Sequence, residues 1–440
     1  MPTSSSRREF IVQSTAAAGA LMVHGSSAAR AGDSPNDKIQ LGLIGCGGMM
    51  QGHVNRLYKH ADKVIVTHVC DPDPGQSENV AAALGPLGDS AKVPRSLDYQ
   101  NVLDDKQVDA VIIATPHHWH VPIALPALQA RKDVYLEKPA SHVFREGRLL
   151  IDAVDKYDRV FQQGTQMRSS PVTEQARQVL ESGILGEIKI TKAWNVQDRG
   201  YRQSVPDSQP PTRVDYDRWL GPAPVLPFNK NRFHRNWRLF RDYGNGDFGD
   251  DGAHDVDMAT FGLGVDSLPV RITAHGSNVQ EPGYREFPDN MNVSFEYADG
   301  RVLIYEDRLF TPYGMHGYDS GNAFYGTEGY MIFTRRGAFR TYLGKNREPG
   351  PKSGKAGRVS TPISDHTGNF LECIRSREKT RANERIAHYT CACIHLGEIA
   401  YRTRTVLEFN PDTEQITNSD EANAMLTKQY RAPYGLPESV

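Results

Sequence analysis

The chain has little cysteine and no surplus of charge of either sign. Its 440 residues include five cysteines, and this odd number, with the spacing Cys391-x-Cys393, does not fit a disulfide framework. The 51 basic residues are balanced by 53 acidic ones, so neither nucleic acid nor an anionic membrane surface is expected as a partner. With 38% hydrophobic and 24% charged residues, the composition is that of a soluble globular chain, and the length favours two domains.

Long hydrophobic runs are also lacking. The apolar run from Ile11 to Val23 is shorter than the ~20 residues of a membrane-spanning helix, so stable membrane insertion is not expected. It follows Arg7-Arg8 and precedes Ala29-Arg30-Ala31, an order typical of a twin-arginine signal with a small-residue cleavage site. We therefore predict that residues 1–31 are a signal peptide for the twin-arginine (Tat) export machinery, and that the mature protein is periplasmic or otherwise exported. The alternative is a disordered basic N-terminus.

Strand-like and helix-like segments alternate, with short connections, between Lys38 and Gly164. The apolar strand-like runs lie at 39–44, 63–70, 108–114, 133–136 and 160–164, and helical patterns lie at 78–84, 122–130 and 143–156. Such alternation predicts right-handed βαβ units around a parallel sheet.

The pattern changes after residue 188, where strand-like segments face each other across turn signals such as Ala298-Asp299-Gly300. These segments lie at 188–195, 270–276, 291–297, 302–307, 323–325, 330–333 and 338–343, and they predict an open, mostly antiparallel sheet. A long loop is expected at 199–235, and helices at 367–375 and 389–404. The predicted fold is an α/β domain at 32–165, an α+β domain at 166–410 and a polar tail at 411–440.

A glycine-rich turn follows the first predicted strand and begins a helix. Its sequence is Gly45-Cys46-Gly47-Gly48-Met49, and glycine lets the backbone approach a pyrophosphate that the helix N-terminus stabilises. Asp71 ends the second strand, where a carboxylate accepts hydrogen bonds from an adenosine ribose and repels a 2′-phosphate. These residues predict an NAD site, with NADP less favoured, although Met50 replaces the usual third small residue. The alternative is a purely structural turn.

Two further motifs are expected at the same edge of the parallel sheet, where ligands collect. Thr115, Pro116 and His120 follow a strand and are predicted to form the nicotinamide side of the pocket. Glu137-Lys138-Pro139 ends the next strand, where the Lys138 ammonium would stabilise alkoxide character at a substrate oxygen. The histidines at 117, 118 and 120 also suggest a metal site, but no complete ligand set accompanies them, and no metal is predicted.

The densest group of ionisable residues lies between 247 and 257. His254 and Asp257 are at i and i+3, on one helical face, and Asp250 precedes them. An imidazole can take a hydroxyl proton as hydride departs, with a carboxylate fixing its tautomer. Two alternatives remain open, an acidic helix N-terminus stabilised by the helix dipole and a divalent-metal site.

In their order and spacing, these motifs resemble the glucose–fructose oxidoreductase, inositol dehydrogenase and rhizopine-catabolism (Gfo/Idh/MocA) family. The matching motifs are GCGG after the first strand, ATP-x-x-x-H at 114–120, EKP at 137–139 and D-x-G-x-H-x-x-D at 250–257. The long insertion before the histidine motif resembles exported members. The resemblance implies a Rossmann domain and an open sheet that covers the nicotinamide and often serves oligomerisation, hence a homo-oligomer, either a dimer or a tetramer.

The resemblance also implies roles by position. Lys138 would contact the reacting hydroxyl and the cofactor, His254 would be the acid/base, and Asp250 would support the substrate or His254. The residues expected to line the substrate pocket are Gln163, Thr165, Arg168, Trp194, Trp237 and Asp257.

The predicted function is hydride transfer between tightly bound NAD and a hydroxyl carbon of a sugar, cyclitol or related polyol. Outside the cytoplasm no dehydrogenase pool renews the cofactor, so a closed redox cycle is expected. One such cycle is the alternative function, a glycosidase that oxidises a ring hydroxyl transiently, eliminates at the glycosidic bond and then reduces the product, for net hydrolysis. A cofactor-bound scaffold without turnover is a third hypothesis, disfavoured because Lys138 and His254 occur together.

Overall fold

The computed structural model describes residues 38–200, 203–281, 283–335, 337–353 and 365–440. The predicted signal peptide at 1–31 lies outside these residues. Within the described ranges, no helix has both the length and the apolar character needed to cross a membrane. All five cysteines are free and buried.

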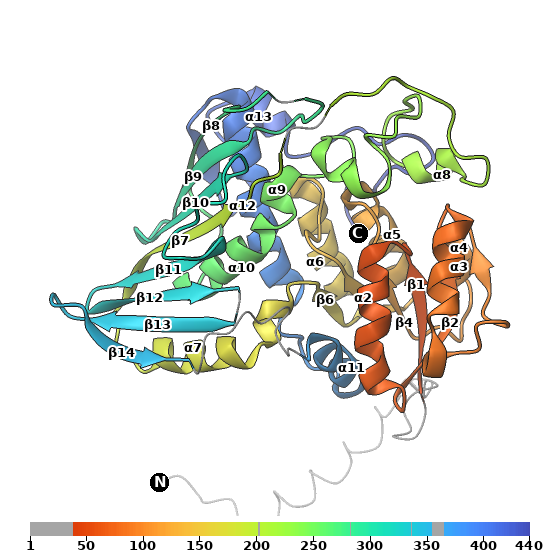
Figure 1. Cartoon of the computed structure of the whole chain (residues 1–440), viewed down its shortest axis with the longest axis horizontal. Coiled ribbons are helices and arrows are strands. Elements are labelled where there is room, and N and C mark those ends of the chain that lie inside the picture. Colours follow the sequence, from red (N-terminus) through yellow and green to blue (C-terminus); the bar gives the residue numbers. More distant parts are fainter. Residues whose placement is uncertain (1–37, 201–202, 282, 336, 354–364) are drawn as a thin grey trace, which may run out of the picture. The chain divides into compact units, whose positions relative to one another are not determined.

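The first sheet is parallel and has the strand order β3-β2-β1-β4-β5-β6 (Figure 1). Its strands are β1 Ile39–Ile44, β2 Val64–Cys70, β3 Arg95–Ser96, β4 Ala110–Ile113, β5 Asp133–Leu136 and β6 Phe161–Gln163. The helices between them are α2 Gly48–Leu57, α3 Pro74–Ala82, α4 Gln100–Leu103, α5 His120–Gln129 and α6 Phe144–Tyr157. β4 and β5 are buried along their whole length, as strands covered on both faces require. The strand order reverses at β1, and ligands bind in the crevice that such a reversal leaves.

The second sheet has ten strands in the order β14-β13-β12-β11-β7-β10-β9-β8-β15-β16. Only the β7–β10 pair is parallel among its recorded pairings. The first strands are β7 Ile188–Val196, β8 Arg271–Ser277, β9 Asn290–Glu296, β10 Val302–Arg308 and β11 Ser320–Gly326, and the others are β12 Gly329–Thr334, β13 Ala338–Leu343, β14 Glu348–Lys352, β15 Leu407–Asn410 and β16 Gln415–Ile416. The predicted fold class, a Rossmann sheet followed by an open and mostly antiparallel sheet, is confirmed.

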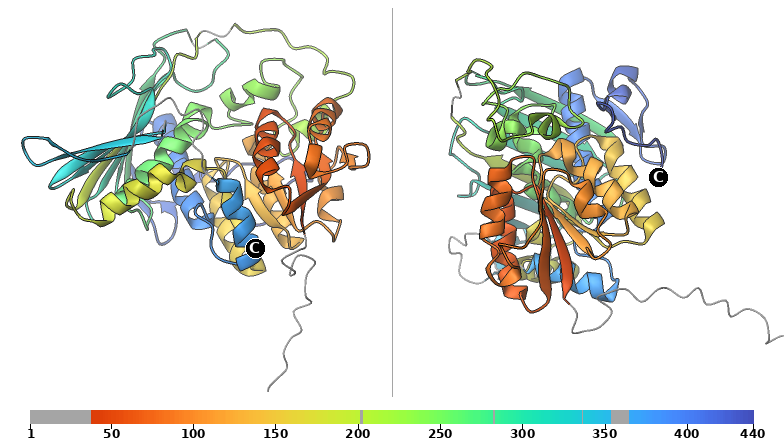
Figure 2. Two further views of the ribbon diagram at one scale, coloured as in Figure 1. Left: turned by 60° about the horizontal axis from the view of Figure 1, so that its bottom comes forward. Right: turned by 90° about the vertical axis from the view of Figure 1, so that its right-hand side faces the viewer.

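Helices cover one face of this second sheet (Figures 1 and 2). They are α7 Pro171–Glu181, α10 Gly252–Leu263 and α12 Glu384–Thr403. The core between α10, α12 and the sheet includes Val256, Ile394, Phe295 and Leu303, all nearly or fully buried. This packing fixes α10, and with it the histidine motif, against the Rossmann domain, because α12 also contacts that domain's core through Ala387 and Cys391.

Two segments differ from the expectation, and a third agrees with it. The predicted loop at 199–235 contains helix α8 (Tyr216–Leu220), and the segment around it has its own aromatic core, formed by Trp219, Phe228, Phe233, Phe240 and Tyr243. The helix predicted at 367–375 is confirmed as α11 (His366–Ser376), which packs Phe370 into the Rossmann core. Residues 411–440 are not a detached polar tail, because β16 pairs with β15 and helix α13 (Asp420–Ala424) contributes Ala422 to the core of the second domain.

Candidate active site

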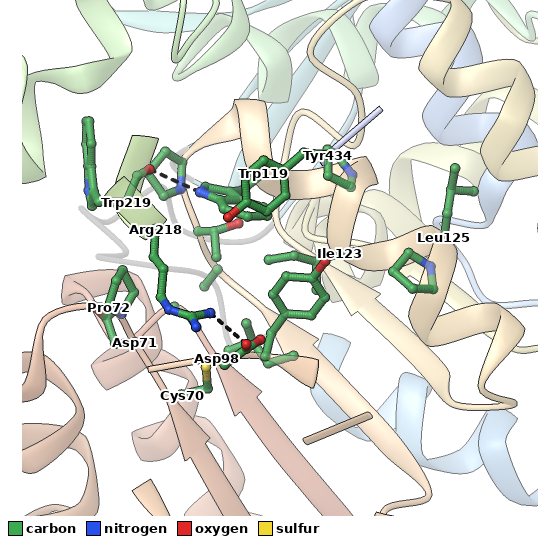
Figure 3. A pocket seen from close by; sticks show the side chains of 18 of the residues that line it. Cys70, Asp71, Pro72, Asp98, Trp119, Ile123, Leu125, Arg218, Trp219 and Tyr434 are labelled. Carbon is green, nitrogen blue, oxygen red and sulfur yellow. Dashed lines mark hydrogen bonds and ion pairs between the residues drawn. The ribbon is translucent and has the colours of Figure 1, made fainter. Parts of the chain in front are cut away.

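The carboxyl ends of β1, β2 and β4 border a cavity of about 1590 Å³. On the Rossmann side it is lined by the predicted residues Gly45, Gly47, Gly48, Met49, Asp71, Thr115 and Pro116. Further Rossmann residues, the insertion before α10 and the C-terminal segment also line it, the last two through residues that include Arg218, Trp219 and Tyr434 (Figure 3). The structure therefore places the glycine turn and the strand-end residues around one space.

The glycines of the turn have two different functions. Gly45 has φ +82°, and a Cβ there would lie 2.7 Å from Thr115 N and 2.8 Å from the carbonyl carbon of Ala114, so only glycine fits. A Cβ on Gly47 or Gly48 would meet no heavy atom within 4 Å. Helix α2 has no side-chain cap, which leaves its first-turn amides available to an anion.

Met50, which replaces the usual small residue, does not disturb this arrangement. Its side chain is fully buried and packs into the core with Val54 and Leu57, on the inner face of α2. The methionine side chain therefore points into the core and does not occupy the side of the turn that faces the dinucleotide cavity.

Asp71 lies at the end of β2, and each of its carboxylate oxygens already accepts one hydrogen bond from a backbone amide. Its Oδ2 accepts a hydrogen bond from Cys46 N at 2.7 Å, and its Oδ1 accepts one from Asp73 N at 2.8 Å. Each oxygen keeps a lone pair for a ribose hydroxyl. Burial raises the pKa of Asp71 to about 6, although the two amides oppose this shift. Cys46 contributes its amide alone, since its thiol is buried and points to Cys70 O.

His120 and Glu137 were expected to bind the cofactor but lie behind the cavity wall. The two ring nitrogens of His120 lie 2.7 Å from Pro139 O and 3.0 Å from Thr115 O, so the ring joins the loops after β4 and β5. Glu137 Oε1 accepts hydrogen bonds from His53 Nε2 at 2.9 Å and Gln166 Nε2 at 3.1 Å. Neither residue lines the cavity. Both position the strand ends that do.

Lys138 is held by the backbone and side chain of Asp250. Its Nζ donates to Asp250 O at 2.9 Å and to Asp250 Oδ1 at 2.5 Å. Asp250 Oδ2 also pairs with Arg238 Nε at 2.7 Å. Burial works against ionisation of Asp250, but Lys138 and Arg238 outweigh it and lower the pKa of this carboxyl. Asp250 therefore supports Lys138, rather than His254 as one alternative had it.

His254 lies in the first turn of α10. Burial lowers the pKa of its imidazole to about 3, with further lowering from the charges of Lys138 and Arg335. The ring is therefore neutral near pH 7 and keeps one nitrogen lone pair as an acceptor. Among the described residues, no side chain or carbonyl forms a recorded hydrogen bond with it, so both nitrogens are available to a substrate. Neither Lys138 nor His254 lines the large cavity, and Lys138 adjoins a second, smaller cavity through Asp250.

Several residues predicted to bind substrate lie elsewhere. Arg168 Nε donates to both oxygens of Asp257 at 2.8 and 2.9 Å, and Asp257 is fully buried, so the two residues are engaged with each other. Trp194 is fully buried in β7, and its Nε1 donates to Tyr318 O. Gln163 and Thr165 are also buried. Of the predicted pocket residues only Trp237 lines the large cavity, where its ring packs edge-on against His117 at 4.6 Å.

Arg218, Trp219 and Tyr434 also line the cavity and were not predicted from the sequence. Arg218 pairs with Asp98 at 2.6 Å, and Trp119 Nε1 donates to Trp219 O at 3.1 Å (Figure 3). Tyr434 packs edge-on against Trp119 with ring centroids 5.0 Å apart. The only sequence signal for this contact is an aromatic residue in an otherwise polar C-terminal segment.

These features fit a dinucleotide. The open space above Gly47 and Gly48 suits a pyrophosphate at the α2 N-terminus, and Asp71 suits an adenosine ribose. Within the ranges that the structure describes, no group of three or more His, Cys, Asp or Glu side chains is placed to hold a metal ion.

Parts of this chain are similar to known inositol dehydrogenases. The inositol 2-dehydrogenase/D-chiro-inositol 3-dehydrogenase of Lactiplantibacillus plantarum is 28% identical over 191 residues, which are 41% of this chain and 52% of that protein. The inositol 2-dehydrogenase of Salmonella typhimurium is 28% identical over 204 residues, 46% of this chain and 57% of that protein. The chain thus spans little more than half the length of these relatives.

Solved structures share the fold at lower identity. Levoglucosan dehydrogenase in complex with NADH is 20% identical with a TM-score of 0.61, covering 81% of this chain and 96% of that one. The WlbA dehydrogenase from Bordetella pertussis, in complex with NADH and UDP-GlcNAcA, is 17% identical with a TM-score of 0.63, covering 85% and 99%.

Two family models match most of the chain. The model described as "Oxidoreductase family, NAD-binding Rossmann fold" matches residues 39–165. The model described as "Oxidoreductase family, C-terminal alpha/beta domain" matches residues 170–322 and 353–436. Together with the fold and the fit of the cavity to a dinucleotide, these matches establish that the chain belongs to the Gfo/Idh/MocA family of NAD-binding oxidoreductases.

Proposed function

We propose that the protein transfers hydride between NAD and a hydroxyl carbon of a sugar, cyclitol or related polyol. The observation that supports this most directly is a fixed ammonium close enough to a neutral imidazole to act on it electrostatically, joined through Asp250 to Arg238 of the dinucleotide cavity lining. Lys138 is held by Asp250, and His254 is neutral with a pKa of about 3.

The residues of the chain account for the proton chemistry. The bound nicotinamide supplies the hydride acceptor. Lys138 Nζ, with two contacts to Asp250, keeps an N–H group for the substrate oxygen and stabilises its alkoxide character. His254 takes the hydroxyl proton. One hydride and one proton thus leave the alcohol, and a carbonyl remains.

A second candidate, a glycosidase acting by transient oxidation and elimination, is favoured by the C-terminal segment. Pro433, Tyr434 and Val440 line the dinucleotide cavity, an arrangement that suits a cofactor retained through a closed redox cycle. The same lysine and histidine would serve its oxidation and reduction steps.

One experiment separates these functions. Purified protein loaded with NAD is mixed with inositols and aldoses, and in parallel with p-nitrophenyl glycosides and no added cofactor. Accumulation of reduced nicotinamide supports the dehydrogenase, and release of nitrophenol without net reduction supports the glycosidase. If NAD binds but neither signal appears with any compound, both proposals fail.

We also propose that the protein is exported through the Tat pathway and forms a homo-oligomer through its open sheet. Fractionation should find a mature form outside the cytoplasm that lacks residues 1–31, and light scattering should give the mass of a dimer or tetramer. A cytoplasmic protein with residues 1–31 intact would contradict export, and a monomeric mass would contradict the oligomer.

A further inference from the structure

A second cavity, of about 60 Å³, lies beside the Lys138–Asp250 pair. Its lining is dominated by charge, with four guanidinium groups and two carboxylates, namely Arg199, Arg235, Arg238, Arg285, Asp247 and Asp250. Arg235 and Arg238 also line the dinucleotide cavity, so the two spaces share a wall. A substrate that reaches Lys138 from the nicotinamide side would place a substituent within reach of this arginine cluster.

Arg285 is the most unusual member of the cluster. Its side chain is 2% exposed, and its Nε, Nη1 and Nη2 atoms have no hydrogen-bond partner among the residues that the structure describes. Its ion-pair partner is Asp289, with an oxygen 3.6 Å from Nη2. Both carboxylate oxygens of Asp289 also accept hydrogen bonds, one from the backbone amide of Val279 and one from that of Gln280. Burial of a guanidinium without hydrogen bonds is costly. An anionic ligand with oxygen acceptors would satisfy it.

The other arginines divide into two groups. Arg199 pairs with Asp247 and Asp251, and Arg238 pairs with Asp250, so these two are neutralised by the protein. Arg235 is exposed and has no recorded ion pair with a described residue. Arg285 has Asp289 as its ion-pair partner, so Arg235 is the lining arginine without a recorded ion pair among the described residues, and Arg285 is the one whose N–H groups all lack acceptors there.

We infer that the substrate carries a carboxylate, as in a uronic or aldonic acid, and that Arg235 and Arg285 bind it. The inference rests on the proposed function, because it places the carboxylate relative to the hydroxyl at Lys138. Arginine matches a carboxylate with two parallel hydrogen bonds. The cavity, of about 60 Å³, has room for a carboxylate group.

The test compares uncharged sugars with their acids on the NAD-loaded protein. Calorimetry measures the Kd of glucose, galactose, glucuronate, galacturonate and gluconate, with glucose 6-phosphate as the phosphate arm. Charge-assisted hydrogen bonds predict that at least one acid binds about 10- to 100-fold more tightly than its neutral partner. The preference should weaken as salt is raised. Equal affinity of every acid and its neutral partner would overturn the inference, and a preference for the phosphate alone would overturn the choice of carboxylate.

Arginine variants test which residues produce the preference for acids over neutral sugars. R285M and R235M should each reduce the preference to within about threefold, whereas R285K should retain part of it. The matched control is R177M, because Arg177 lies on exposed α7 and pairs with Glu174 and Glu181. Should R285M fail to fold, R235M decides the question, since Arg235 is exposed. A preference that survives in R235M, R285M and the control alike places the carboxylate elsewhere.

Failure of the inference is distinguishable from failure of the proposed function. If neutral sugars and their acids bind equally and both reduce the bound NAD, the oxidoreductase stands and the carboxylate site does not. If acids bind tightly through Arg285 but no sugar reduces NAD, the anion site stands and the proposed activity falls.

Discussion

The two halves of the site are built in different ways. The cofactor half consists of residues that follow neighbouring strands of one sheet, Gly45, Asp71 and Thr115, and its requirements are mainly steric. The substrate half brings together Lys138, Asp250 and Arg285 from distant parts of the chain, and its requirements are electrostatic. Substitutions in the first half should therefore change cofactor affinity or folding, and those in the second half should change the chemical step.

The largest effect is expected for Lys138→Met. Loss of the ammonium removes stabilisation of the alkoxide, so kcat should fall about 10²- to 10³-fold. The Kd for NAD should stay within about threefold, since Lys138 does not line the dinucleotide cavity. Single-turnover reduction and NADH fluorescence measure the two quantities. The control is Lys189→Met, an exposed lysine that pairs with Glu187. If Lys138→Met weakened NAD binding by as large a factor as it lowered kcat, the cofactor half and the substrate half would not be distinct.

His254→Asn should lower kcat by about 10²-fold, because a general base is lost. In the wild type the pKa of His254 lies at about 3, below its usual value, so the imidazole stays neutral as the pH falls from 8 to 5. His254 should therefore produce no acid limb in kcat over that range. A limb near pH 6.5 that is absent from His254→Asn would show that the ring titrates as an exposed imidazole does and would contradict the lowered pKa.

A pair of glycine variants tests the cofactor half. Gly45→Ala should destabilise the fold by about 2–4 kcal/mol, because Gly45 has φ +82° and its Cβ would overlap Thr115 N. Gly47→Ala should leave Tm unchanged, since its Cβ meets only open space, but should weaken NAD binding about tenfold through contact with the pyrophosphate. Thermal melts and NADH titrations measure both. If Gly47→Ala binds NAD normally, the pyrophosphate does not lie there.

The smallest expected effect is a gradual change of NAD affinity with pH. Asp71 has a pKa raised to about 6, so its acceptor carboxylate is present above that value and is lost as the pH falls below it. The Kd for NAD should rise by about tenfold between pH 7 and pH 5, since affinity follows the ionised fraction. Asp71→Asn should bind more weakly and show a flat profile over the same range. A wild-type affinity independent of pH would mean that the ribose does not contact Asp71.

The cofactor half could be predicted from the sequence because local rules determine it. A strand, a glycine turn and a helix place Gly45 and Gly47, and the end of the next strand places Asp71. Lys138 was located by the same reasoning, since it ends another strand of that sheet. The effect of Met50, which replaces the usual small residue, is also local, because its side chain packs into the Rossmann core beneath α2.

Much of the substrate half could not be predicted, because side-chain partners decide it. Arg168 and Asp257 suggested a polar pocket, yet they pair with each other away from both cavities. Trp194 follows a strand pattern, but that pattern does not say which face of a sheet meets the site, and its ring is fully buried. Arg285 gave no signal in the sequence, because its importance comes from burial without a hydrogen-bond partner.

The most direct test of the account follows a labelled hydrogen. A polyol or sugar acid that binds the NAD-loaded protein is supplied with deuterium on its carbinol carbons, and the cofactor is then analysed by mass spectrometry. The account predicts deuterium in the reduced nicotinamide of the wild type, and its near loss in Lys138→Met with NAD still bound. Bound NAD that stays unlabelled in the wild type, with every binding substrate, would contradict hydride transfer at this site.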